Sequence, residues 1–266
     1  MPMCPKVLSE TEGNIARITL NRPEKKNALD LELMQELVAA GEALAERRDL
    51  RAVILSGAGG TFSSGLDVSA MGKIAAVAAQ EGGIMHRSHG DANLFQRVST
   101  LWADLPMPVI AAVEGYAFGG GLQIALGADI RVADPQAKLS VMEAKWGLVP
   151  DMGGMVALRH LVRADILRRL TWTAEVIDGA QALEYGLVTE LNDAPQVRAE
   201  ALARQIAARS PQAVRAAKRL ISDAFRLDDA ALLLAESAAQ AALIGQPNQM
   251  EAVRAGMEGR APDFSD

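Results

Sequence analysis

The stretch Pro108–Gln123, PVIAAVEGYAFGGGLQ, joins a short apolar run to three consecutive glycines. The run Pro108–Val113 is typical of a buried strand, and Leu122–Leu126 has helical character. Glycines that enter a helix leave backbone N–H groups bare, and the helix dipole draws a negative oxygen toward them. The same glycines are also explained by a tight turn with close helix–strand packing, and spacing alone leaves both explanations open.

A second glycine-bearing turn, Phe62–Asp67 (FSSGLD), follows the strand predicted over Ala52–Ser56. An N–H group of its Gly65-Leu66 turn and one from the triple-glycine turn would together make a two-donor oxyanion hole. The spacing from Gly60 to Gly65 matches a phosphate loop, but Leu66-Asp67 stands where Lys-Ser/Thr is required, which excludes a nucleotidase. The sequence also lacks the glycine fingerprint of dinucleotide-binding folds and the Gly-x-Ser-x-Gly of nucleophile-elbow hydrolases. The pair His86 and His89 is better read as part of a solvated loop than as a metal site.

Strand and helix patterns alternate along the first part of the chain, which predicts an α/β fold. Two β-like runs, Lys6–Glu12 and Ile15–Leu20, flank the hairpin-type junction Gly13-Asn14. Asp30 is the expected N-cap of the helix that follows. A further strand is predicted over Ile130–Ala133.

Two other regions differ from this alternation. Val68–Ser99 has no clear apolar stripe, so we expect a mobile segment beside a site. From Pro195 the chain is alanine-rich and helical to about Glu258, with breaks at Ser210-Pro211 and Gly245–Asn248. We therefore predict an α/β core over residues 1–195 and a helical C-terminal region over 196–266.

Composition excludes several classes of protein. The 266 residues carry 27 Lys and Arg against 33 Asp and Glu, a net charge of −6, which together with the absence of a basic block argues against nucleic-acid binding. A hydrophobic content of 50% is too high for a disordered chain. No uncharged run approaches the ~20 residues of a membrane span, and no secretory signal is visible. The single cysteine, Cys4, excludes an internal disulfide, and we expect a soluble, cytoplasmic protein.

Several ordered blocks resemble the enoyl-CoA hydratase/isomerase (crotonase) superfamily. They are Ile18–Pro23 with Lys26–Leu29, Phe62–Asp67, Pro108–Gly115, Gly119–Gly121, Ala128–Ala133 and the ending Arg260–Phe264. The resemblance covers nearly the whole chain. It implies an α/β fold with a crotonase-like ββα spiral core, and C-terminal helices that build homotrimers or dimers of trimers.

The resemblance also implies the ligand and its contacts. The substrate would be an acyl-CoA thioester, with no metal, nicotinamide or flavin cofactor, and its carbonyl oxygen would accept hydrogen bonds from the N–H groups of Leu66 and Gly120. Such a hole stabilises a thioester enolate. The residues expected to contact substrate or CoA are Lys26, Ala28, Ser64, Asp67, Val68, Ser69 and Gln123.

The acidic residues bear on the reaction. Hydratases of the superfamily use two glutamates, and here the first position is Gln123 while Glu143 matches the second. Glutamine has no titratable proton and cannot act as a general base. A second carboxylate, Asp151, follows Pro150, which resembles the double-bond isomerases of the superfamily.

The best functional hypothesis is isomerisation of 3-enoyl- or dienoyl-CoA in fatty-acid or related acyl-CoA catabolism. A loop that turns back between Glu143 and Asp151 would bring both carboxyl groups to the substrate. The alternative explanation of either residue is that it caps a helix. The alternative reaction is hydration of 2-enoyl-CoA by Glu143 and a water held by Gln123, in which case Gln123→Glu should raise hydration. A non-catalytic acyl-CoA-binding paralogue is the second alternative.

Overall fold

The structure is a computed structural model that describes residues 5–79 and 82–266. Cys4 and residues 80–81 of the segment predicted to be mobile lie outside this range. Within it, no helix is both long and apolar enough to cross a bilayer.

The main sheet has six strands, in the order β1-β2-β3-β4-β6-β9. These are β1 (Val7–Glu12), β2 (Ile15–Leu20), β3 (Ala52–Gly57), β4 (Val109–Val113), β6 (Ile130–Ala133) and β9 (Glu190–Leu191). β1 and β2 form an antiparallel hairpin, which confirms the predicted turn, and each later pairing is parallel. Gly13 permits this turn because its φ is +58°. A smaller sheet joins β5 (Tyr116–Phe118), β7 (Lys138–Ser140) and β8 (Ile177–Asp178).

Helices follow most of the strands. The α-helices are α1 (Leu31–Ala45), α2 (Met71–Ala78), α3 (Leu94–Asp104), α4 (Gly120–Leu126), α5 (Gly154–Leu161), α6 (Ala164–Thr173), α7 (Gly179–Glu184), α8 (Pro195–Ala207), α9 (Pro211–Asp223), α10 (Asp229–Leu243) and α11 (Pro247–Glu258). Short 3₁₀ turns are η1 (Pro23–Lys25), η2 (Val68–Ala70), η3 (Gly83–Met85) and η4 (Glu143–Trp146). Asp30 caps α1 as expected, because its side chain accepts a hydrogen bond from the Leu33 N–H at 2.9 Å.

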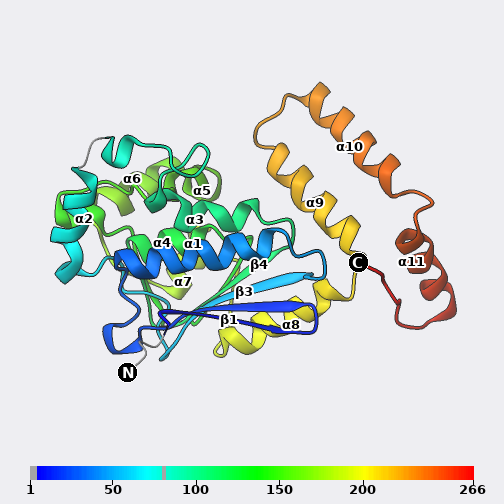
Figure 1. Cartoon of the computed structure of the whole chain (residues 1–266), viewed down its shortest axis with the longest axis horizontal. Helices are drawn as coiled ribbons and strands as arrows, with labels where there is room; N and C mark the ends of the chain where they lie inside the picture. The colour runs from blue at the N-terminus through cyan, green and yellow to red at the C-terminus, as the bar shows by residue number, and fades with distance from the viewer. Residues whose placement is uncertain (1–4, 80–81) are drawn as a thin grey trace.

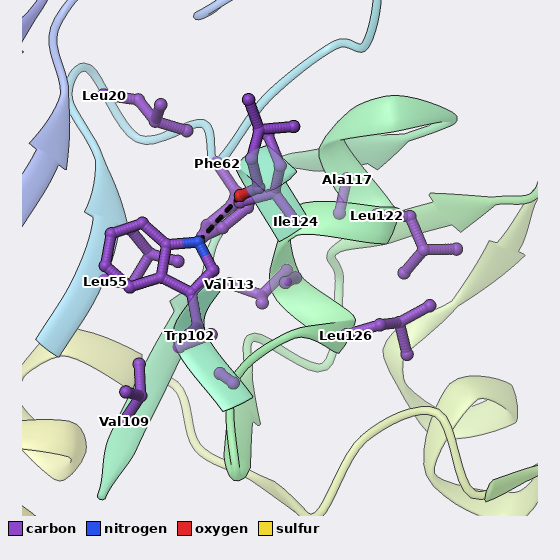
Figure 2. Packing of buried hydrophobic residues seen from close by; sticks show 14 of the residues in the cluster. Leu20, Leu55, Phe62, Trp102, Val109, Val113, Ala117, Leu122, Ile124 and Leu126 are labelled. Atoms are coloured by element: carbon purple, nitrogen blue, oxygen red, sulfur yellow. Dashed lines mark hydrogen bonds between the residues drawn. The ribbon is translucent and has the colours of Figure 1, made fainter. Parts of the chain in front are cut away.

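The main sheet lies between two helical layers (Figure 1). α1, α3 and α4 cover one face, and α8 lies against the other, where its alanines pack on strand residues such as Ile54 and Ile110. Trp102 of α3 is fully buried in the larger core, beside Leu55 and Phe62 (Figure 2). Its indole N–H donates to the Val98 carbonyl at 2.9 Å, so this large side chain buries no unpaired donor. The core thereby fixes the loops at the carboxyl ends of β3 and β4.

The last three helices extend away from this body as an arm (Figure 1). Lys218 of α9 anchors the arm, because its ammonium group donates to the carbonyls of Trp102 and Met107 and pairs with Asp129 at 2.7 Å. α8 packs on the sheet, although it follows the predicted boundary at residue 195, so the arm begins only at α9. α10 buries none of its residues.

The expectation for Val68–Ser99 is wrong for its last part. α3 begins at Leu94 with a capping box between Asn93 and Gln96, and it buries Phe95, Val98 and Trp102. The segment boundary at Ser99 divides this helix, so its apolar stripe, which continues to Leu101 and Trp102, was cut in two. The segment was also predicted to lie beside a site. Its helix α2 lines the cavity described below.

Candidate active site

Two glycine-bearing turns lie side by side, of which one follows β3 and the other follows β5 and opens α4. A short parallel bridge joins them, in which the Ser63 N–H donates to the Tyr116 carbonyl at 2.8 Å and the Phe118 N–H donates to the Ser63 carbonyl at 3.1 Å. Gly65 has φ +87°, and a Cβ there would lie 2.7 Å from the Phe118 carbonyl oxygen. Only glycine permits this approach, so the close packing of the two turns is built into the sequence at residue 65.

The two expected oxyanion donors, Leu66 and Gly120, line the same cavity. The bridge from Leu29 to this turn uses the Gly65 carbonyl and the Asp67 N–H, which leaves the Leu66 N–H outside the pairing. Gly120 is the first residue of α4, where an N–H has no partner within the helix. Across residues 5–79 and 82–266, neither N–H donates to a protein acceptor. Both are therefore available to a ligand oxygen.

The cavity next to these donors has a volume of about 390 Å³ and is mostly apolar. Its walls come from α2 and η3, from the start of α3, and from the loop after η4. The apolar lining residues include Met71, Ile74, Ile84, Phe95, Phe118 and Leu148. Its acidic members are Glu143 and Asp151, which the structure brings to one cavity as predicted. The segment between them is a 3₁₀ turn and a loop.

Glu143 is the buried acid of the site, with 8% of its surface exposed. Its Oε1 accepts a hydrogen bond from Gln123 Nε2 at 2.6 Å, whereas Oε2 has no hydrogen-bond partner among the described residues. Burial raises the pKa of this carboxyl group, and the negative charge of Asp151 raises the pKa further, while backbone N–H groups and the Gln123 amide act in the opposite direction. A carboxyl group with a raised pKa is suited to proton transfer near neutral pH.

Asp151 lies at the rim of the cavity and is more exposed than Glu143. The surrounding protein removes enough water to raise the pKa of its carboxyl group as well. The N-cap of α5 is Gly153, and no side chain in the described part of the chain caps that helix. The alternative explanation of Asp151 as the cap of α5 is therefore wrong.

Gln123 lies behind Glu143, and 2% of its surface is exposed. Its Oε1 accepts from the N–H groups of Met152 and Gly154 at 3.0 and 2.9 Å, while its Nε2 donates to Glu143. Gln123 is absent from the residues described as lining the cavity. It contacts the catalytic candidate Glu143, and the expectation that it holds a water or the substrate stays a prediction.

The remaining predicted contacts divide into two groups. Ser64 and Val68 line the cavity. Asp67 instead pairs with Arg22 at 2.7 Å, and its Oδ1 accepts from the Ser69 hydroxyl at 2.6 Å. These hydrogen bonds, first that of Ser69 and then that of Arg22, lower the pKa of Asp67 to about 2. Asp67 and Ser69 thus bind each other and hold the turn after Leu66.

Two further predicted residues lie on the neighbouring loop, outside the cavity lining. The Ala28 carbonyl accepts from Arg22 at 3.0 Å. The Lys26 ammonium group lies 4.7 Å from the centre of the Tyr116 ring, a cation–π contact. Their contact with CoA stays a prediction.

Sequence reasoning missed three kinds of site residue. Arg22 was named only within the block Ile18–Pro23 and given no role, yet its ion pair with Asp67 holds the Leu66 turn. Met152 packs against the glycine turn, since a Cβ on Gly120 would lie 2.4 Å from its sulfur. The α2 wall carries Met71, Ile74 and Ala75, whose i, i+3, i+4 spacing was the available sign of an apolar helix face.

Known proteins are similar to this chain in sequence and in fold. Residues 10–266 match the family model described as Enoyl-CoA hydratase/isomerase. The short-chain-enoyl-CoA hydratase of Clostridium acetobutylicum is 32% identical over 257 residues, which cover 96% of this chain and 95% of that protein. Enoyl-CoA hydratase EchA19 of Mycobacterium tuberculosis is 34% identical over 262 residues, 98% of this chain and 96% of that protein. A crystal structure of an enoyl-CoA hydratase from Bacillus anthracis aligns with a TM-score of 0.86 at 30% identity, covering 97% of this chain and 98% of the other.

The α/β body, its paired glycine turns and the apolar cavity with carboxylates define an enzyme of the crotonase fold. The chain belongs to the enoyl-CoA hydratase/isomerase family.

Proposed function

We propose that this enzyme isomerises the double bond of an enoyl-CoA thioester. The observation that carries the proposal is the meeting of two carboxyl groups, those of Glu143 and Asp151, with the free N–H groups of Leu66 and Gly120 at one cavity. Two acids that differ in burial are suited to removing a proton at one carbon and supplying one at another.

The proton transfers use these groups, and solvent restores their protonation states afterwards. The Glu143 carboxylate takes a proton from C2 of a 3-enoyl-CoA, and the C–H electron pair moves into the thioester, whose oxygen becomes an enolate. The N–H groups of Leu66 and Gly120 stabilise that oxygen. Protonated Asp151 then gives its proton to C4 while the double bond moves to C2–C3, and exchange with solvent returns both acids to their starting states.

We further propose that the acyl chain of the substrate carries no charge. Among the described residues, no Lys, Arg or His lines the cavity, and its two acids would repel an acyl group with its own carboxylate. The apolar wall of α2 would instead favour a hydrocarbon chain, as expected in fatty-acid or related acyl-CoA catabolism.

Hydration of 2-enoyl-CoA is the second candidate, because the relatives named above are called enoyl-CoA hydratases. Glu143 would then serve as the single acid–base group, since both ends of the Gln123 amide already bind protein. A non-catalytic acyl-CoA-binding role remains the third outcome of the test.

A substrate panel separates these functions. 2-Enoyl-, 3-enoyl- and dienoyl-CoA thioesters of several chain lengths are incubated with the enzyme, and products are identified by mass and absorbance. Conversion of 3-enoyl- or dienoyl-CoA without change of mass supports isomerisation. A gain of one water on 2-enoyl-CoA, with no isomerisation, supports hydration, and CoA affinity without turnover supports a binding protein. Glu143→Gln serves as the matched inactive control.

A further inference from the structure

The side chain of Gln123 forms a buried link between the two parts of the site that carry acids. It lies on α4, at the helix that opens with the triple glycine, and it joins Glu143 to the loop Met152–Gly154. That loop directly follows Asp151. A single side chain therefore bridges the surroundings of both carboxyl groups.

The orientation of this amide follows from its partners. Met152 and Gly154 each present a backbone N–H, and only the amide oxygen can accept from them. The amide nitrogen must then face Glu143, where it donates to Oε1. Reversing the amide would set N–H groups against N–H groups on one side and leave two oxygens facing each other on the other.

This fixed donor makes the two oxygens of Glu143 unequal. Oε1 faces an N–H group, so a proton on Oε1 would meet another donor. Oε2 has no hydrogen-bond partner among the described residues. Any proton that Glu143 carries therefore belongs on Oε2.

We propose that Gln123 is a positioning residue. It selects Oε2 of Glu143 as the proton-carrying oxygen, and it fixes the position of the Glu143 carboxyl group relative to the loop after Asp151. This inference rests on the proposed function, in which Glu143 transfers the proton. Gln123 is not among the described residues that line the cavity of Glu143 and Asp151, and in this proposal it acts through Glu143 and the loop backbone.

A glutamate at this position would not act as a second, independent acid. One of its oxygens would accept from Met152 and Gly154, and the other would lie where Nε2 now lies, 2.6 Å from Glu143 Oε1. Two carboxyl oxygens at this separation need one shared proton. On this geometry we expect Gln123→Glu to couple its titration to that of Glu143, whereas the sequence alone led us to expect faster hydration.

Three variants test the inference through the pH dependence of kcat/KM for the substrate that the wild-type enzyme converts. Gln123→Glu keeps the acceptor for the loop and changes only the contact with Glu143, so we expect the acidic limb of the profile to move up by about one pH unit or more. Gln123→Met removes all three hydrogen bonds, and we expect kcat to fall ~10–100-fold with KM changed by less than ~3-fold.

Gly154→Ala disturbs the same link from the loop side. A Cβ at residue 154 would lie 2.6 Å from Gln123 Cγ and 2.8 Å from Oε1, so the amide must shift although its chemistry is unchanged. We expect kcat to fall, as it should for Gln123→Met. Urea unfolding of each variant establishes that the protein is folded, and Gln123→Glu decides the question if Gln123→Met does not fold.

The outcomes separate this inference from the function on which it rests. Folded Gln123→Glu and Gln123→Met enzymes with the wild-type pH profile and kcat would overturn the positioning role, even though Glu143→Gln abolishes turnover. Full turnover by Glu143→Gln would instead overturn the proposed function, because no other buried carboxylate lines the described cavity.

Discussion

Arg22 and Asp67 lie 45 residues apart in the sequence, and their side chains form an ion pair of 2.7 Å beneath the Leu66 turn. Arg22 also donates to the Ala28 carbonyl, so one guanidinium group holds the loop before α1 against the turn that bears the oxyanion donor. Asp67 additionally caps η2 through the Ser69 N–H at 2.9 Å. The position of Leu66 thus depends on a long-range contact between charged groups.

Asp67→Asn should destabilise the protein in a pH-dependent way. Asparagine keeps the cap but loses the charge that pairs with Arg22, at a cost of about 1–3 kcal/mol at pH 7. The pKa of Asp67 is lowered to about 2, so its stabilisation is present above pH 4 and is lost as the pH falls toward 2. Urea unfolding at pH 7, 5 and 3 should show the gap between variant and wild type narrowing with acid. A constant gap would mean that the charge of Asp67 contributes nothing.

Gly65→Ala should reduce both stability and turnover. The new Cβ would lie 2.7 Å from the Phe118 carbonyl oxygen at a φ of +87°, so the two turns must separate. We expect a loss of about 1–3 kcal/mol and a fall in kcat of at least ~10-fold, because the oxyanion donors no longer lie together. Gly13→Ala is the matched control, since its φ is +58° but a Cβ there meets nothing within 4 Å. Equal loss of activity in both variants would argue against a special role for the Gly65 contact.

Glu143→Gln and Asp151→Asn should each impair catalysis with little change in substrate binding. Each replacement keeps the shape of the side chain and removes the group that transfers a proton, so kcat should fall by roughly 10²–10⁴-fold. Single-turnover kinetics and CoA-thioester binding measured on the same preparations separate chemistry from affinity. Unchanged kcat for Asp151→Asn would leave Glu143 as the only acid that transfers a proton.

Glu143→Gln should also stabilise the fold at alkaline pH. The pKa of Glu143 is raised in the folded state, so the contribution of this residue to stability is fully present below its unfolded pKa and is lost as the pH rises through the folded value. Glutamine removes this loss. Thermal unfolding should therefore show a higher Tm for the variant at pH 8 and a smaller difference at pH 4. If the Tm difference, variant minus wild type, were smaller at pH 8 than at pH 4, the sign of the pKa shift would be contradicted.

The arm should assemble copies of the chain into a trimer or a dimer of trimers. Its helices expose apolar side chains, among them Leu234 of α10, which is 71% exposed. Leu234→Glu should shift the protein toward monomer in light scattering at micromolar concentration. Val197→Glu places the same charge at an equally exposed site (70%) on α8 of the body and should leave the assembly intact. A wild-type protein that scatters as a monomer would refute the assembly.

Local patterns in the sequence determined much of this protein. The hairpin at Gly13, the cap at Asp30 and the strands on either side of the two glycine turns all depend on neighbours within a few residues, so periodicity and turn chemistry predict them. Glu143 and Asp151 were predicted as site residues because carboxylates at those positions match a family pattern, and both line one cavity.

Tertiary structure decided what several of those residues do. Gln123 and Gly154 are 31 residues apart, and Arg22 and Asp67 are 45 apart, yet each pair is joined by a hydrogen bond. Such contacts depend on how α4, the loop after η4 and the Leu66 turn pack on a common core, which no local periodicity encodes. The burial of Glu143 also depends on tertiary packing, because the residues that surround it come from distant parts of the chain. This burial raises the pKa of its carboxyl group.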